Sequence, residues 1–316
     1  MQAYVLKRTL SVIPSLLGIC VLVFLLLRLI PGDVVDQMLG AQNTITEGQR
    51  QSLRHFFGLD QPLPLQFWDW IRHIAVGDLG ASFRTATPVT ELILSRMPVT
   101  LELTLFSMLI GTAIGLSTGV IAAVWRNSPL DDGARIVSLF GLSIPEFWQG
   151  TMLLLITSLW LHWIPPVDYV APWENPLRNL LTMLLPAVSL GTVLAANVTR
   201  MTRSAMLDVL SRDYVRTARA KGLVERTVML RHALKNALIP VITVSGLQVG
   251  YLLGGAVIVE QVFTLPGIGR LLLDSIYGRD YPVVQGTVLV VAFAFVVVNL
   301  IVDLLYAVLD PRISYA

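Results

Sequence analysis

Long apolar runs separated by polar segments dominate the pattern of this 316-residue chain. A helix needs about 20 mainly apolar residues to cross a bilayer, and several stretches reach that length. The pattern therefore predicts an all-α fold: a polytopic membrane helix bundle with about six transmembrane helices and a small external helical insertion. The predicted spans are approximately 10–30, 99–124, 135–161, 179–200, 237–260 and 284–309.

The first and third spans have distinctive features. Lys7 and Arg8 precede the first apolar run in the manner of a secretory signal, but no small-residue cleavage site follows it, so we expect an uncleaved span. Gly141 and Pro145 interrupt the third span, and Glu146 lies next to the proline. Because proline removes a backbone donor, the third span is predicted to be a broken or kinked helix.

The polar stretch between the first two spans predicts a small, mostly helical external domain. Phe67, Trp70, Ile71 and Ile74 recur at helical spacing, which is typical of an amphipathic helix resting on the membrane or on a neighbour. Two interpretations stay open: a cap packed on its own bundle, and a docking surface. The chain divides into the N-terminus and first span at 1–30, the external insertion at 31–98, and a core transmembrane domain at 99–316 that contains a cytoplasmic loop at 201–240.

Basic residues are distributed unevenly, and this distribution predicts the orientation. The N-terminus, the 125–135 loop, the 200–235 loop and the C-terminus together carry 14 of the 23 Lys and Arg residues. By the positive-inside rule, these segments are cytoplasmic, and both termini with them. The net charge is only +2, so no general attraction to nucleic acid is expected.

Two of the predicted spans carry glycines at intervals of four residues. Small residues at this spacing form a smooth stripe that lets helix backbones approach closely. The stripes are either static packing surfaces or surfaces that slide and line a pathway in a moving bundle. They consist of Gly111, Gly115 and Gly119 in the second span, and of Gly246, Gly250 and Gly254 in the fifth.

Polar groups inside the spans are sparse, which disfavours an ion-coupled carrier or channel, because such proteins carry several ionisable groups at membrane depth. Asp303, near the cytoplasmic end of the last span, is predicted to be a structural contact between helices or at the interface. No His or Cys cluster has the spacing of a metal site, and Cys20 has no partner cysteine. No catalytic constellation is present either, so we expect neither a metal site nor an enzyme.

The central cytoplasmic loop is the most informative segment. Tyr214, Val215 and Ala218 fall on one helical face, while the arginines fall on another. Gly222 can adopt the positive φ that ends a helix, and Pro240 is predicted to open the buried part of the fifth span. The layout predicts a short helix, a glycine turn, a second helix and a span, which together form a rigid projection below the membrane. The alternative is a basic loop that only sets topology.

The segment Asp213–Gly222, with Pro240 eighteen residues after its glycine, resembles the EAA loop of ABC importer permeases. The wider sequence resembles the first permease subunit of the dipeptide, oligopeptide and nickel family over essentially the whole chain. The blocks that carry this resemblance are Arg28–Asp33, Gly58–Pro62, Gly77–Gly80, Ser143–Trp148, Pro266–Arg270, Arg279–Gly286 and Leu309–Arg312.

The resemblance implies a non-catalytic permease of an ATP-driven importer in the bacterial inner membrane. Its implied partners are a second homologous permease, two cytoplasmic ABC ATPase subunits that bind ATP and Mg, and an external solute-binding protein. The chain has no GxxxxGK[ST] phosphate loop, so we expect no cofactor in this subunit. The loop would form a coupling helix in a groove of the ATPase, through Asp213, Tyr214, Arg216, Thr217, Ala218, Ala220, Lys221 and Gly222.

The cargo is left open by the resemblance. Family members carry dipeptides, oligopeptides, glutathione, opines and nickel chelates, and we expect small peptides here. The alternative is the same machinery importing nickel or another metal chelate, glutathione or an opine. The short connection between the third and fourth spans keeps the metal-chelate alternative open.

Overall fold

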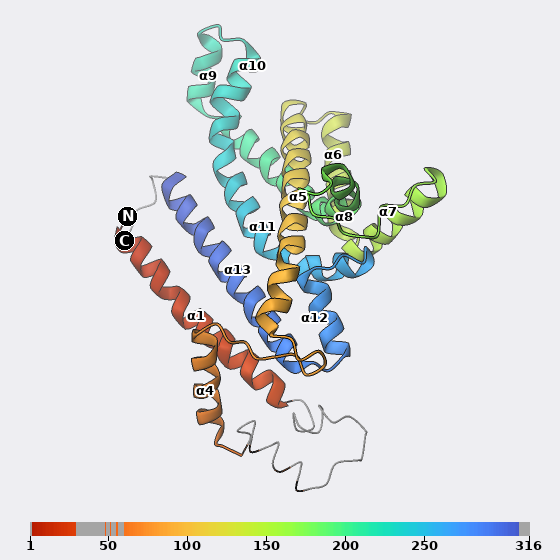
Figure 1. The fold of residues 1–316 in the computed structure, drawn as a ribbon. Helices are drawn as coiled ribbons and strands as arrows, with labels where there is room; N and C mark the ends of the chain where they lie inside the picture. The colour runs from red at the N-terminus through yellow and green to blue at the C-terminus, as the bar shows by residue number, and fades with distance from the viewer. Residues whose placement is uncertain (1, 30–47, 49–50, 52–54, 56–59, 310–316) are drawn as a thin grey trace.

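The computed structural model describes residues 2–29, 48, 51, 55 and 60–309 of the chain. Five helices in this part are long and apolar enough to cross a membrane, and a bent helix pair makes a sixth crossing if it is counted as one span. The prediction of an all-α, polytopic membrane bundle is confirmed (Figure 1).

The helices are named by the labels in Figure 1, and their order follows the chain. Their bounds are α1 Gln2–Leu29, α4 Leu63–Ala75, α5 Val89–Val124, α6 Pro129–Ser143, α7 Glu146–Trp160, α8 Pro176–Leu210, α9 Asp213–Ala220, α10 Glu225–Thr227, the π-helix η1 Val228–Leu234, α11 Lys235–Val262, α12 Ile268–Tyr277 and α13 Tyr281–Leu309.

The centre of the bundle is the long contact between α5 and α8, against which α11 also packs. Leu103 of α5 and Leu190, Leu194 and Val198 of α8 are almost fully buried in this core. Apolar residues at the contacts among α5, α8 and α11 therefore form a packed interior, and many others are exposed on the outside of the bundle.

The helices α1 and α13 pack against each other beside this centre (Figure 1). The guanidinium Nε of Arg8 donates a hydrogen bond to Oδ2 of Asp303 over 2.6 Å. Asp303 is therefore a structural contact between two helices, as its position near the end of the last span predicts.

The helix α4, in the segment predicted to be external, lies at the end of the molecule opposite α9 and α10 (Figure 1). The Phe67 ring lies 5.2 Å from the Phe24 ring of α1, and the Trp70 ring lies 5.7 Å from it. The amphipathic helix thus rests on the protein's own first span, which supports the interpretation as a cap. Much of the insertion lies outside the described residues, and so do parts of the blocks Arg28–Asp33, Gly58–Pro62 and Leu309–Arg312.

Two predicted boundaries differ from the structure. The helix α5 begins at Val89 and runs through Pro98, so the division at residue 99 between insertion and core falls inside a helix. Burial of Val89 and Ile93 against Ile268 and Val283 stabilises this first part of α5, although Pro98 lacks a backbone donor. At the other end of the core, α8 continues to Leu210, so the beginning of the predicted 201–240 loop is helical.

The third span is broken, as predicted. The axes of α6 and α7 differ in direction by 107° at the break that contains Pro145. Gln149 donates a side-chain hydrogen bond to the Ile144 carbonyl over 3.0 Å, and Ser189 donates one to the Glu146 carbonyl over 3.0 Å. Gln149 thus satisfies a carbonyl at the end of α6 that a continuous helix would satisfy internally, and Ser189 ties the start of α7 to α8.

The helix α11 agrees with the predicted fifth span at 237–260, but the role predicted for Pro240 was wrong. Pro240 lies inside α11 and does not open its buried part, because Ala233 and Ala237 are already buried ahead of it. The preceding helix is a π-helix, and Val228 in it is fully buried. Packing of Ala233 and Ala237 against α8 keeps the helix continuous through Pro240.

Candidate functional site

The helices α9, α10 and η1 form a projection from the bundle, at the top of Figure 1. Val215 and Ala218 on the inner face of α9 are 0% and 6% exposed. They pack against Val228 of η1, with Val209 and Leu210 at the end of α8 completing the cluster. Because α9 is anchored on two sides by apolar contacts, it is a fixed surface and not a loose loop.

The turn that follows α9 has the geometry that its glycine predicts. Gly222 has a φ of +76°, a conformation that L side chains rarely adopt. Its N–H donates to the Arg219 carbonyl over 2.9 Å, and the Leu223 N–H donates to the Ala218 carbonyl over 3.4 Å. This pair of bonds is the Schellman motif, which satisfies the last carbonyls of α9 and reverses the chain.

Polar contacts hold α9 to the following helices. The Arg219 guanidinium donates to both carboxylate oxygens of Glu225, over 2.7 Å and 3.2 Å, and this bond raises the pKa of Arg219. Asn236 donates through Nδ2 to the Tyr214 hydroxyl over 2.9 Å and to the His232 carbonyl over 2.9 Å. Since the ion pair is exposed, it contributes little stability, and the apolar anchor dominates.

The predicted coupling residues therefore all lie on one projection, but they do not all face outward. Ala218 is buried and belongs to the anchor. The other predicted residues are exposed and form what we call the α9 surface: Asp213, Tyr214, Arg216, Thr217, Ala220, Lys221 and Gly222.

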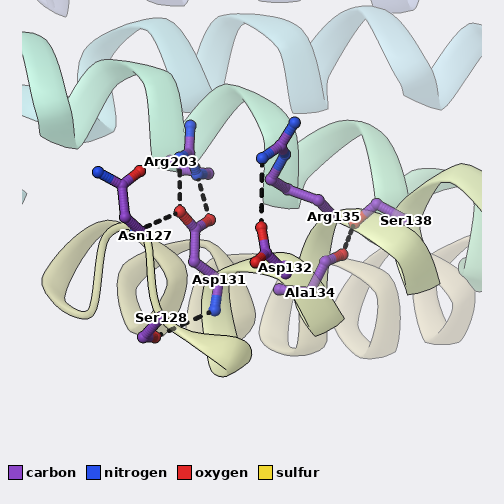
Figure 2. Close-up of polar contacts among 8 residues, drawn as sticks. All are labelled: Asn127, Ser128, Asp131, Asp132, Ala134, Arg135, Ser138 and Arg203. Carbon is purple, nitrogen blue, oxygen red and sulfur yellow. Dashed lines mark hydrogen bonds and ion pairs between the residues drawn. The ribbon is translucent and has the colours of Figure 1, made fainter.

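A buried ion pair on the same side of the bundle was missed by sequence reasoning. Figure 2 shows Arg203 of α8 facing Asp131 of α6, and its Nε and Nη2 donate to the two carboxylate oxygens over 2.6 Å and 2.7 Å. The Asn127 N–H donates to the same carboxylate over 3.0 Å, and the Ser128 side chain caps α6. The only sequence signal was an acidic residue in the first turn after a Ser-Pro helix start.

The glycine stripe of the second span is a packing surface in this structure. A Cβ atom on Gly111, Gly115 or Gly119 would collide with the backbone and side chains of α8. The matching stripe on α8 was not recognised, although its spacing is the same. It consists of Ala187, Gly191, Ala195 and Thr199.

The glycine stripe of the fifth span divides in two. A Cβ atom on Gly246 would meet Val302, and one on Gly250 would meet the ring of Phe295, both on α13. A Cβ atom on Gly254 would meet nothing within 4 Å. Equal spacing along one helix therefore conceals two environments, one packed and one open.

Glu260 is fully buried near the C-terminal end of α11. Its carboxylate accepts a hydrogen bond from the Thr100 hydroxyl over 2.5 Å and one from the Arg270 N–H over 3.0 Å, so it stabilises the start of α12. A Cβ atom on Gly267 would overlap this carboxylate. The block Pro266–Arg270 is therefore explained as a tight turn around a buried acid.

The sequence matches two family models that together span most of the chain. Residues 115–315 match the family described as the binding-protein-dependent transport system inner membrane component, and residues 1–104 match the N-terminal part of such membrane components. The chain belongs to this family. It is thus a multi-pass inner-membrane permease of the ABC importer class, which is a class of transport subunits and not of enzymes.

Similar proteins align over the full length of the permease. The glutathione transport system permease protein GsiC of Salmonella choleraesuis (strain SC-B67) is 46% identical over 316 residues, covering 100% of both chains. Its namesake in Escherichia coli (strain K12) is 44% identical over 317 residues, again with 100% coverage of both. Both alignments place the chain among permeases of the peptide and glutathione branch.

A solved structure supports the fold. The crystal structure of an amino acid ABC transporter with histidines superposes with a TM-score of 0.51 and 18% sequence identity, over 71% of this chain and 95% of that one. At this identity the likeness concerns the arrangement of the transmembrane helices alone.

Proposed function

We propose that this permease couples ATP hydrolysis by two cytoplasmic ABC ATPase subunits to the import of short peptides, with the tripeptide glutathione as the foremost candidate. The observation that carries the coupling role is the α9 surface. It is exposed, rich in polar and basic groups, and held by a buried apolar anchor at the foot of a spanning helix.

Force applied to α9 would reach the membrane through a short path. Val215 and Ala218 press on Val228 of η1, and η1 continues directly into α11. A displacement of α9 by the ATPase would therefore shift α11 relative to its neighbours. Import follows if ATP binding favours one of two arrangements of the permease pair, which requires different contact energies in the two states.

Membership of the family suggests the other subunits of the transporter. A second homologous permease would complete the pathway, an external solute-binding protein would deliver the cargo, and the ATPases would hold ATP and Mg on the side of α9. This places both termini in the cytoplasm, in agreement with the positive-inside rule.

The cargo is inferred from the relatives that are named for glutathione transport. Because glutathione is a tripeptide, these names agree with a small-peptide cargo. Among the described residues, no group of three or more His, Cys, Asp or Glu side chains could hold a metal ion.

The proposal is tested by reconstituting the permease with its partner subunits in proteoliposomes and measuring ATP-dependent uptake of labelled glutathione and of dipeptides. The double substitution R216A/K221A alters only exposed groups of the α9 surface and is expected to abolish both ATPase retention and uptake. The substitution R226A, at an exposed arginine outside that surface, serves as the control. Uptake without an ATPase, or normal uptake by the double variant, would contradict the coupling role.

A further inference from the structure

An acidic residue lies deep in the membrane-spanning part of the permease. Glu146 is the first residue of α7, at the 107° break between α6 and α7. Its backbone carbonyl accepts a hydrogen bond from Ser189, well inside the long helix α8, and its carboxyl group faces the hydroxyl of Tyr251, well inside α11. Both neighbours place Glu146 far from the ends of the spans.

The carboxyl group of Glu146 has no basic partner among the residues that the structure describes. Its Oε1 atom is buried and accepts no hydrogen bond, and none of the bases that the structure describes forms an ion pair with it. Two other acids of the bundle are paired with bases, since Asp131 binds Arg203 and Asp303 binds Arg8. An acid at membrane depth is costly and points to a functional site, for which its partner must be found.

The local backbone does not supply that partner. The N-terminus of α7 carries roughly half a positive charge, which offsets only part of one carboxylate charge. A helix break at membrane depth is tolerated where it is buried in protein or lines a water-filled cavity, and in other transporter folds broken helices form substrate sites near the midplane. The break at Pro145 therefore combines a geometry suited to a pathway with an acidic side chain.

The neighbouring face of α11 is left open by the other described residues of the chain. Tyr251 is 51% exposed, and Leu247 and Ile258 on the same side of the helix are similarly exposed. Gly254, between them, has open space where a side chain would be. A phenol hydroxyl and a carboxyl group on an uncovered face inside a membrane are suited to a polar solute and not to lipid.

We propose that the Glu146 carboxylate binds the ammonium group of a peptide as the peptide passes through the permease, with the Tyr251 hydroxyl beside it. This inference rests on the proposed import of short peptides, each of which carries a free amino group; in glutathione it belongs to the glutamyl residue. Charge complementarity selects the ammonium end of the cargo, so this subunit contributes to selectivity in addition to any external binding protein.

The test compares the complete transporter containing the unaltered permease, E146Q, E146D or E102Q in proteoliposomes. Glu102 is a matched control, because it also has one unpartnered oxygen and a tyrosine neighbour, Tyr169, but lies on α5 away from the break. Glutathione and N-acetylglutathione, which lacks the ammonium group, are the two probes. ATP hydrolysis stimulated by the binding protein is measured in parallel, because it shows that each variant transporter is assembled and active.

We expect E146Q to lower glutathione uptake at least about tenfold, as for loss of a charge-assisted hydrogen bond, while ATP hydrolysis persists. E146D should retain most of the glutathione uptake, and E102Q should match the unaltered protein. For N-acetylglutathione, uptake by E146Q should equal uptake by the unaltered protein. Glutathione uptake by E146Q at the unaltered rate would overturn the inference, as would equal losses for both probes. Absence of uptake by the unaltered transporter would instead overturn the proposed function.

Discussion

Asp131 and Arg203, 72 residues apart in the sequence, join the start of α6 to the C-terminal part of α8 through two hydrogen bonds of 2.6 Å and 2.7 Å (Figure 2). The Asp131 side chain is fully buried and that of Arg203 is 23% exposed. The pair fixes the α5–α6 connection against the helix that leads into α9, so the base of the α9 projection is held from two directions.

Removing the arginine from this pair should destabilise the permease more than removing an exposed arginine. R203A leaves a buried carboxylate without its partner, and we expect a loss of about 2–3 kcal/mol in the free energy of unfolding, given the partial exposure of Arg203. R135A, which breaks the exposed 3.4 Å pair with Asp132, should change it by less than about 0.5 kcal/mol. Thermal unfolding in detergent measures both, and equal effects would contradict the structural role of the pair.

The two glycine stripes should respond differently to the same change. G115A places a Cβ atom against the Ala195 carbonyl and Val198, so α5 and α8 must separate, and we expect a large loss of folded protein. G254A meets no atom within 4 Å and should be neutral or stabilise the helix by up to about 1 kcal/mol. Yield and melting temperature in detergent compare the two variants, and a stable G115A protein would refute the close approach of α5 to α8.

Gly222 should be required for its backbone conformation alone. No atom lies within 4 Å of a Cβ placed there, but the φ of +76° disfavours a β-branched residue by about 1–2 kcal/mol. G222V is expected to insert normally and to lose coupling between ATP hydrolysis and uptake, because strain falls on the turn that positions the α9 surface. G222N, which tolerates positive φ, should keep most of the coupling. The measurement is the amount of solute taken up per ATP hydrolysed. The same ratio for G222V and G222N would argue against this role.

The helix α4 should depend on Trp70 for its attachment to α1. Trp70 packs on Phe24 and Phe67, and W70A is expected to destabilise the protein by about 1–2 kcal/mol through lost apolar burial and ring contacts. W68A is the matched control, because Trp68 is 53% exposed and stacks with the side chain of Arg72. If both variants unfold at the same temperature, α4 is held to α1 by other contacts.

Local patterns predicted much of this permease correctly. Apolar run length indicates the spanning helices, because a bilayer imposes a minimum length on any helix that crosses it. The break at Pro145 and the turn at Gly222 were also predicted, since proline lacks a backbone donor and glycine alone adopts positive φ freely.

Pairings between distant segments were decided by the tertiary structure. Nothing in the spacing of the glycines distinguishes Gly115, packed against α8, from Gly254, which faces open space. The Asp131–Arg203 pair and the unpartnered carboxyl group of Glu146 depend on which helix faces each side chain. Similarly, α5 starts at Val89 because Val89 and Ile93 are buried by residues from α12 and α13. A sequence determines the conformations available to each segment, whereas burial and pairing depend on contacts made only when the helices assemble.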